Sequence, residues 1–306
     1  MNKVNTIIVS LFLLSLCVTT TWAQDAGDYP DMSGKTILIT GSTDGLGREV
    51  ATRLGRLGAH MLIHGRNAQR GAEVVAEIKN NGGNAEFYQA DFGSLDNVRK
   101  MAEAINRDHQ RLDVLVNNAG LGAGFAGGER RESEDGYEML FQVNYLAHYL
   151  LTELLLPTLK DRAPSRIINI TSRSQMALNF DDLNQDNEHS GRSAYRLSKI
   201  AQVMHTFYYA ELLEGTGVTF NTLHPASRMG TTMVLQTPGP VRSAVDEGAN
   251  VVMYVATSPD LQGRSGIYFE QYDEGRAHDQ TYDEAARERL DKMTREILGL
   301  PGRENQ

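Results

Sequence analysis

The residue types best suited to chemistry in this chain are a tyrosine and a lysine four positions apart, Tyr195 and Lys199. On a helix, residues with this spacing lie on the same face. A tyrosine with its ordinary pKa of about 10 exchanges protons poorly near neutral pH. A neighbouring ammonium group favours the phenolate, so the pair could act as a general acid and base. A surface pair on an amphipathic helix would show the same spacing.

A serine, Ser172, stands 23 residues before Tyr195 and follows the apolar run 167–170 and Thr171. At the end of a strand, its hydroxyl could donate to a substrate oxygen and stabilise developing negative charge. A helix cap or a turn would explain a lone serine equally well. The serine, the tyrosine and the lysine together, in this order, are harder to explain as chance.

A glycine-rich turn lies far upstream of these residues, in the sequence TGSTDGLG at positions 40–47. It follows the β-branched run 36–39 and precedes an amphipathic helix pattern. A strand, a glycine turn and a helix N-terminus together form an anion site whose backbone N–H groups point at a pyrophosphate. A purely structural turn could look similar. We expect the turn to bind a dinucleotide through Gly41, Ser42, Thr43, Asp44, Gly45, Leu46 and Gly47.

The elements that must position these residues alternate along the chain. Strand-like segments lie at 36–40, 60–64, 86–89, 113–117, 166–170, 218–223 and 266–269. Helix-like segments lie at 46–57, 67–80, 95–108, 136–160, 193–214, 245–257 and 282–298. This alternation predicts an α/β fold, a doubly wound parallel sheet with helices on both faces. We expect one domain over 35–300, a linker over 24–34 and a short tail over 301–306.

Ligands of a doubly wound sheet bind beyond the carboxyl ends of its strands. The second predicted strand ends at His64, Gly65 and Arg66, where an acidic residue would bind the ribose 2′-hydroxyl of NAD. The acid is missing, and a guanidinium group suits a phosphate dianion. The pattern therefore favours NADP(H) over NAD(H), although a solvated surface arginine is the simpler alternative.

Two further strand ends carry candidate cofactor contacts. Asp91 and Phe92 follow the third predicted strand, where the carboxylate could accept from an adenine amino group or could cap the helix that starts near Leu95. Asn118 belongs to the segment Asn117–Gly120 after the fourth strand, whose amides could tie neighbouring strands and whose small residues leave space for a cofactor.

Composition excludes several classes of protein. The net charge is −9 and there is no basic block, which argues against nucleic-acid binding. The single cysteine, Cys17, precedes the predicted domain, so the domain has no disulfide, thiol nucleophile or cysteine metal site. We predict no metal site from the sequence.

The N-terminus resembles a secretory signal peptide. Lys3 precedes an apolar stretch over 7–18, and Thr21 and Ala23 are small residues at the −3 and −1 positions of a cleavage site. We expect cleavage after Ala23 and export to a periplasmic, lumenal or extracellular space. A retained anchor over residues 7–23 that holds the domain at a membrane is the alternative.

Taken together, these motifs resemble those of a short-chain dehydrogenase/reductase of the Rossmann type, over residues 35 to 275. The resemblance rests on the glycine turn, Asp91, the segment Asn117–Gly120, Asn144, Ser172, Tyr195 and Lys199. The long interval between Ser172 and Tyr195 is similar to that of retinol-dehydrogenase-like and related bacterial members.

The resemblance implies an oxidoreductase that interconverts an alcohol and a carbonyl group by hydride transfer from or to NADP(H). Tyr195 would be the general acid and base, Ser172 would bind the substrate oxygen, and Lys199 would hold the ribose and support the phenolate. Asn144 would hold a water that connects Lys199 to solvent. The resemblance also implies a homodimer or homotetramer, formed through the helices that carry Asn144 and Tyr195. It suggests a small lipophilic alcohol, aldehyde or ketone as substrate.

Other functions on the same fold remain open from sequence. A non-catalytic NADP-binding sensor would need only the cofactor half of the motif set, and a sugar epimerase or dehydratase of the related extended group would use bound cofactor catalytically.

The family usually has Pro-Gly and then a threonine after the sixth strand, whereas this chain has Ala226 after Pro225 and reaches Thr231 one residue late. An apolar pocket is suggested by Phe180, Met229, Met233, Val234 and Leu235.

Overall fold

Residues 29–303, which the computed structural model describes, contain one eight-stranded sheet with the order β3-β2-β1-β4-β5-β6-β7-β8. Neighbouring strands from β3 to β7 are parallel, and β8 pairs antiparallel with β7. The chain winds outward from β1 to β3 and then crosses to β4 on the other side of β1. The gap at this reversal is where ligands bind in such sheets. The strands are β1 Thr36–Ile39, β2 His60–Gly65, β3 Asn84–Gln89, β4 Val114–Asn117, β5 Ser165–Ile170, β6 Val218–His224, β7 Tyr268–Glu270 and β8 Asp273–Glu274.

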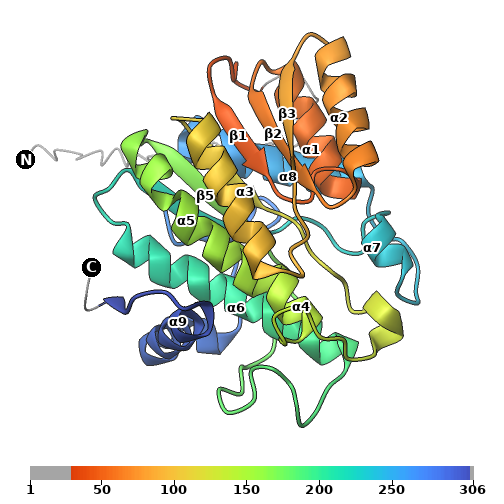
Figure 1. The fold of residues 1–306 in the computed structure, drawn as a ribbon, viewed down its shortest axis with the longest axis vertical. Helices are drawn as coiled ribbons and strands as arrows, with labels where there is room; N and C mark the ends of the chain where they lie inside the picture. Colours follow the sequence, from red (N-terminus) through yellow and green to blue (C-terminus); the bar gives the residue numbers. More distant parts are fainter. Residues whose placement is uncertain (1–28, 304–306) are drawn as a thin grey trace, which may run out of the picture.

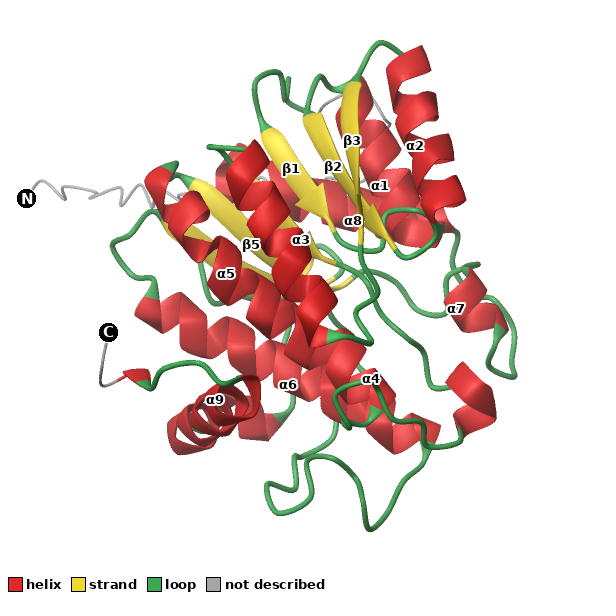
Figure 2. Cartoon of the chain, viewed as in Figure 1, coloured by secondary structure: helices red, strands yellow, loops and turns green. Residues whose placement is uncertain are grey.

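Helices cover both faces of the sheet (Figure 1). They are α1 Gly45–Arg56, α2 Ala68–Asn80, α3 Leu95–Asp108, α4 Met139–Phe141, α5 Ala147–Asp161, α6 Gly191–Leu212, α7 Thr232–Leu235, α8 Val245–Thr257 and α9 Glu284–Leu298. A π-helical turn, Gln142–Leu146, joins α4 to α5 without a break. Short 3-10 turns lie at Phe125–Gly128, Pro259–Leu261 and Asp279–Tyr282. The long connections on the side of α4, α6 and α7 are loops (Figure 2).

The core has two halves because side chains of a strand alternate between its faces. On β1, Leu38 packs in the half formed with α3, α5 and α6, whereas Ile37 and Ile39 pack in the half formed with α1 and α8. Central strands buried on both faces explain the continuous apolar runs in the sequence.

The C-terminal helix α9 packs against α6 and α5, on the side of these helices away from β1 (Figure 1). Its Arg295 is almost fully buried and pairs with Glu153 of α5 at 2.8 Å. Arg303 reaches the same carboxylate at 3.3 Å and Asp291 of α9 at 3.1 Å. Tyr145 of the π-helical turn shares a 2.8 Å hydrogen bond with Thr294. This helix therefore covers a polar face of the α5–α6 pair.

The structure confirms the predicted fold class and the order of elements. The predicted helix over 136–160 begins at Met139 and contains the π-helical turn, which no local pattern indicated. Packing begins inside the predicted linker, because Met32 is buried and its N–H donates to Leu57 O at 2.8 Å. It also continues past residue 300, since Arg303 forms the ion pairs given above.

The predicted leader over 1–23 lies outside the described residues. Across residues 29–303, we find no helix with the length and apolar character that crossing a bilayer requires.

Candidate active site

A cleft of about 1360 Å³ opens at the carboxyl ends of β1, β2, β4, β5 and β6. Its walls include the glycine turn, Arg66, Asp91, Asn118, Ser172, Tyr195 and Lys199. Most ligand pockets measure about 300–1,000 Å³, so this cleft can hold a ligand larger than an ordinary metabolite. The fold thus brings Gly41 and Lys199, which are 158 positions apart in the sequence, to one cleft.

The glycine turn is packed too tightly for side chains. A Cβ on Gly41, whose φ is +64°, would lie 2.8 Å from Ala119 Cα, and a Cβ on Gly47 would lie 2.5 Å from both Gly41 O and Asn118 Nδ2. Asn118 donates from Nδ2 to Thr40 O at 2.8 Å, which fixes the turn to the end of β4. The first N–H groups of α1 have no partner within the helix. The turn therefore presents backbone donors to the cleft, as a pyrophosphate requires.

Ser42 is placed differently from its neighbours. It is fully buried and does not line the cleft, unlike the other predicted residues of the turn. Its hydroxyl donates to Ile39 O at 2.7 Å and accepts from His64 N at 3.0 Å, while its own N–H donates to His64 O at 2.9 Å. These bonds correct the expectation that Ser42 contacts the cofactor, since its polar groups already hold β1 to β2.

His64 also holds the glycine turn in place through hydrogen bonds. Its Nδ1 accepts from Gly41 N at 3.0 Å and its Nε2 lies 3.2 Å from Ala90 O, so Nε2 carries the proton. Burial lowers the pKa of His64 to about 4. The ring stacks on Phe92 with centroids 4.3 Å apart. Phe92 is thus mainly a packing residue, although it also borders the cleft.

The end of β2 has the features that the sequence indicated for a 2′-phosphate. A Cβ on Gly65 would lie 2.6 Å from Thr43 Cγ2, so an acidic side chain does not fit there. Arg66 is exposed and borders the cleft. Arg70, which the sequence analysis missed, borders the cleft as well and lies 3.4 Å from Asp44 Oδ2. Its position in the first turn of α2, directly after the end of β2, was the available signal.

Asp91 lies at the cleft and does not cap α3. Its Oδ1 accepts from Gly93 N at 2.9 Å, within the turn that follows β3. The N–H of Leu95 is instead bound by Asp135 Oδ2 at 2.8 Å, from a distant loop. The capping alternative for Asp91 is therefore wrong.

Ser172, Tyr195 and Lys199 meet at the cleft between β5 and α6. Ser172 follows β5 and lines the cleft together with Tyr195. Lys199 Nζ lies 5.6 Å from the centre of the Tyr195 ring. It donates to Ile170 O at 3.0 Å and to Gln202 Oε1 at 2.8 Å. The spacing of four on a helix thus places the phenol and the amine beside each other.

Burial dominates the electrostatics of this group. It lowers the pKa of Lys199 to about 7 and raises the pKa of Tyr195, although the Ser172 side chain opposes the second shift. In this state the phenol keeps its proton. The side-chain amide of Gln175 donates to Ser172 O at 2.7 Å and so holds the backbone at the serine. Neither Gln175 nor Gln202 was identified from sequence, because glutamine carries no distinctive motif there.

Asn144 sits in the π-helical turn and is fully buried behind the cleft. Its side chain accepts from Leu121 N at 2.7 Å and donates to Leu121 O at 3.1 Å and Ser198 Oγ at 2.9 Å. It does not line the cleft. Its amide therefore joins the loop after β4 to the helix that carries Tyr195.

His148 links Asn144 to the glycine turn. Its Nδ1 donates to Asn144 O at 2.9 Å, so its Nε2 accepts from Thr40 Oγ1 at 2.9 Å. Thr40 Oγ1 in turn accepts from Asn118 N at 2.8 Å and Ala119 N at 2.9 Å. Burial lowers the pKa of His148 to about 3. One neutral histidine thus joins the strand end that precedes the glycine turn to the π-helical turn that carries Asn144.

The remaining wall of the cleft is formed by loops. Met229, Met233 and Val234 border it, as does Thr231. Phe180 does not; it packs under Arg289 instead, with the guanidinium 4.6 Å from the ring centre. Leu235 points away and is 70% exposed. Two of the five residues predicted for an apolar pocket, Phe180 and Leu235, therefore lie outside the cleft lining.

The model of the family described as short chain dehydrogenase matches residues 35–238 of this chain. The chain belongs to this family. Its sequence is 35% identical over 303 residues to retinol dehydrogenase 14 of Mus musculus, which covers 90% of each chain. It is 31% identical over 299 residues to polyprenol dehydrogenase of Homo sapiens, covering 89% of this chain and 87% of the relative.

Solved structures agree with the fold. A protein from Mycobacterium paratuberculosis described as putative and uncharacterized superimposes with a TM-score of 0.75 at 24% identity, over 90% of this chain and 98% of the other. A short chain dehydrogenase from Burkholderia cenocepacia, solved in complex with NADP, gives a TM-score of 0.63 at 26% identity, over 78% and 97%. Members of the family are enzymes that act on CH–OH and C=O groups, and this chain is such an oxidoreductase.

Proposed function

We propose that this enzyme interconverts a lipophilic alcohol and the corresponding aldehyde or ketone by NADP(H)-dependent hydride transfer. The observation that carries the proposal is the assembly of Ser172, Tyr195 and Lys199 at the cleft that also holds the glycine turn. A protein that only bound the cofactor would need the turn but not this group. The assembly therefore favours catalysis over a sensor role.

The bound nicotinamide would supply or accept the hydride, and the chain supplies the rest. Ser172 donates to the substrate oxygen and stabilises charge that develops there. Tyr195, protonated because burial raises its pKa, donates the proton in reduction. Lys199 stabilises the phenolate that remains and is itself held by Ile170 O and Gln202. Asn144 keeps the loop after β4 and α6 in register, so that these groups converge.

The preference for NADP(H) rests on the end of β2. Gly65 leaves no room for the acid that recognises a 2′-hydroxyl, and Arg66 and Arg70 offer two cations to a 2′-phosphate. The Burkholderia cenocepacia relative was solved with NADP. Thr43, whose side chain packs on Gly65, would lie beneath the same phosphate.

The lipophilic substrate class is supported by the wall residues Met229, Met233 and Val234 and by the names of the retinol and polyprenol dehydrogenase relatives. The enzyme would be exported after cleavage of the predicted leader, with N-terminal sequencing of the native protein as the test. A chain that starts at Met1 and sediments with membranes would point to the anchor instead.

The decisive experiment is a turnover assay of the purified enzyme with NADPH and NADH against aldehydes, ketones, retinoids and steroids. We expect turnover with NADPH, and its loss in Tyr195→Phe while NADPH binding, followed by fluorescence titration, stays within about twofold of wild type. Tyr254→Phe on α8 is a matched control that removes a phenol outside the cleft. Normal turnover in Tyr195→Phe would refute the mechanism.

A further inference from the structure

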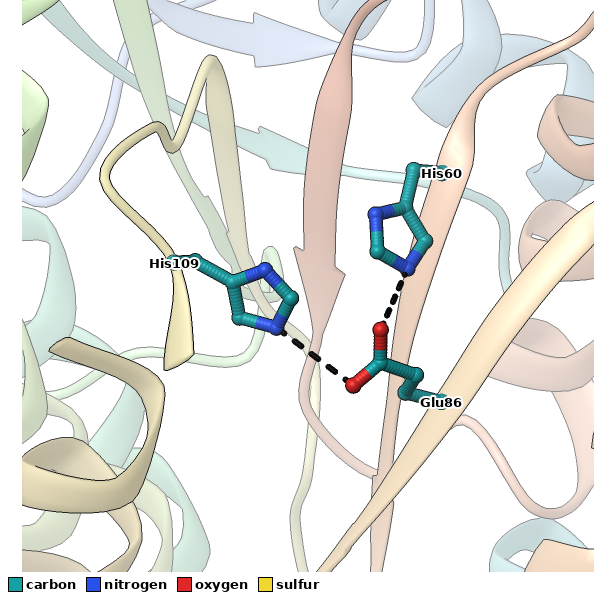
Figure 3. A group of neighbouring side chains, drawn as sticks. All are labelled: His60, Glu86 and His109. Carbon is teal, nitrogen blue, oxygen red and sulfur yellow. Dashed lines mark ion pairs between the residues drawn. The ribbon is translucent and has the colours of Figure 1, made fainter. Parts of the chain in front are cut away.

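Three side chains converge near the amino ends of β2 and β3, away from the cleft (Figure 3). His60 is the first residue of β2, Glu86 lies on the neighbouring strand β3, and His109 follows α3. The Nε2 of His60 lies 3.0 Å from Glu86 Oε1, and the Nε2 of His109 lies 3.7 Å from Glu86 Oε2. The possible ligand atoms, one from each residue, all lie within 4.8 Å of one another.

These separations match a metal site. In tetrahedral zinc sites the Zn–N and Zn–O bonds measure about 2.0–2.2 Å, so two ligand atoms lie about 3.3 Å apart. The two observed separations, which join the two imidazoles to different oxygens of the Glu86 carboxylate, lie on either side of that value. Two imidazoles and one carboxylate are also a common donor set for zinc, with a fourth position left for water. We propose that His60, Glu86 and His109 form a binding site for Zn²⁺ or a similar first-row divalent cation.

The state of His60 supports a ligand role. Its Nε2 is buried and, although close to Glu86, it forms no hydrogen bond of acceptable geometry with any described residue. A buried polar atom without a partner is costly, and a metal bond would remove that cost.

The charges around the site are nearly balanced. Glu86 and Asp108 are the nearby anions. Arg107 forms an ion pair with Asp108 at 2.9 Å, and Lys79 is a second nearby cation that interacts electrostatically with His60. Bound Zn²⁺ would therefore be neutralised mainly by Glu86. Imidazole ligands favour Zn²⁺, Co²⁺ or Ni²⁺ over Mg²⁺ and Ca²⁺, which prefer oxygen.

One group competes with the metal. The hydroxyl of Tyr88 lies 2.8 Å from His109 Nε2 and 3.2 Å from Asp108 Oδ2. Metal binding would break its contact with His109 and leave Asp108 as its acceptor. Removing the hydroxyl should therefore not weaken binding.

The site would join the edge strand β3 to β2 and to the end of α3. It lies at the opposite end of β2 from Gly65, about 16 Å away at the usual rise of a parallel strand. The bound ion would act as a structural link and take no part in the reaction. Its stabilising effect should appear as a higher Tm and not as a change in turnover.

The test is calorimetric titration of Zn²⁺ into the metal-free full chain without a histidine tag. We expect one Zn²⁺ per chain with a raised Tm in the wild type, and a Kd at least about 100-fold weaker in Glu86→Gln and in His109→Asn. Tyr88→Phe should bind as tightly as wild type or more tightly. His278→Asn, outside the cluster, should change nothing.

A spectroscopic measurement on the wild type makes the test independent of how the variants fold. Co²⁺ should give the intense visible absorption of a four-coordinate site, and X-ray absorption of the Zn²⁺ form should show two imidazole ligands. Absence of stoichiometric binding, Co²⁺ spectra typical of octahedral coordination, binding that survives Glu86→Gln and His109→Asn, or binding that Tyr88→Phe abolishes would each overturn the assignment.

Discussion

The proposed preference for NADPH over NADH can be tested at a single side chain, Arg66. Truncating one partner of a charge-assisted hydrogen bond costs about 1.5–3 kcal/mol. Arg66 is exposed, and solvent screens exposed charges, so the lower part of that range applies. A loss of about 1.5–2 kcal/mol corresponds to about a 10- to 30-fold weaker Kd for NADPH in Arg66→Ala. NADH, which lacks the 2′-phosphate, should bind about equally to both proteins.

The assay is fluorescence titration of NADPH and NADH into wild type, Arg66→Ala, Arg70→Ala and the double variant. Arg70→Ala should have a smaller effect, because its guanidinium is shared with Asp44. The difference between wild type and Arg66→Ala should shrink at high salt, where exposed charges are screened. Arg107→Ala, at an exposed position outside the cleft, is the control for loss of one positive charge. Equal affinities of the wild type for both cofactors, or an equal loss for both in Arg66→Ala, would refute the reasoning.

Three further outcomes are expected. With a pKa of about 7, Lys199 loses its positive charge as the pH rises, so kcat for reduction should fall as the pH rises through 7. Lys199→Met should turn over slowly, and its kcat should show no such dependence on pH near 7. Burial gives His148 a pKa of about 3 in the folded protein, whereas in the unfolded chain it is protonated below about pH 6.5. The free energy of unfolding should therefore decrease as the pH falls from 6.5, because the unfolded state then binds a proton that the folded state does not. Urea unfolding should show a loss of about 2 kcal/mol at pH 5 from this residue, and His148→Gln should reduce the slope. Gly47→Ala should weaken NADPH binding more than tenfold, because its Cβ would overlap Gly41 O, and normal affinity would contradict the close packing of the turn.

The sequence predicted the sheet and its helices well because their signals are local. The buried parallel strands are continuous apolar runs, and Val245–Thr257 is helical over the whole predicted range. The placement of Tyr195 beside Lys199 was also predictable, because a spacing of four residues on a helix fixes their relation whatever the rest of the chain does.

Features that depend on distant partners could not be predicted in this way. Ser42 looked like a cofactor residue, but β2 brings His64 against it and uses its hydrogen bonds. The helix α3 takes its cap from Asp135, 40 residues away, and not from Asp91. Likewise His60 and Glu86 are 26 positions apart, which matches no metal-binding motif, and only the pairing of β2 with β3 brings them together.

The position of α9 bears on how copies of this enzyme could associate. The resemblance to the family implies an oligomer formed through the helices that carry Asn144 and Tyr195, yet part of that helical surface already has a partner within the same chain. A second copy would have to displace Arg295 from Glu153, and breaking a buried ion pair costs about 3–5 kcal/mol. The C-terminal segment thus occupies part of the surface through which the resemblance would have subunits meet, and an oligomer that keeps α9 in place would form through surfaces that α9 leaves exposed.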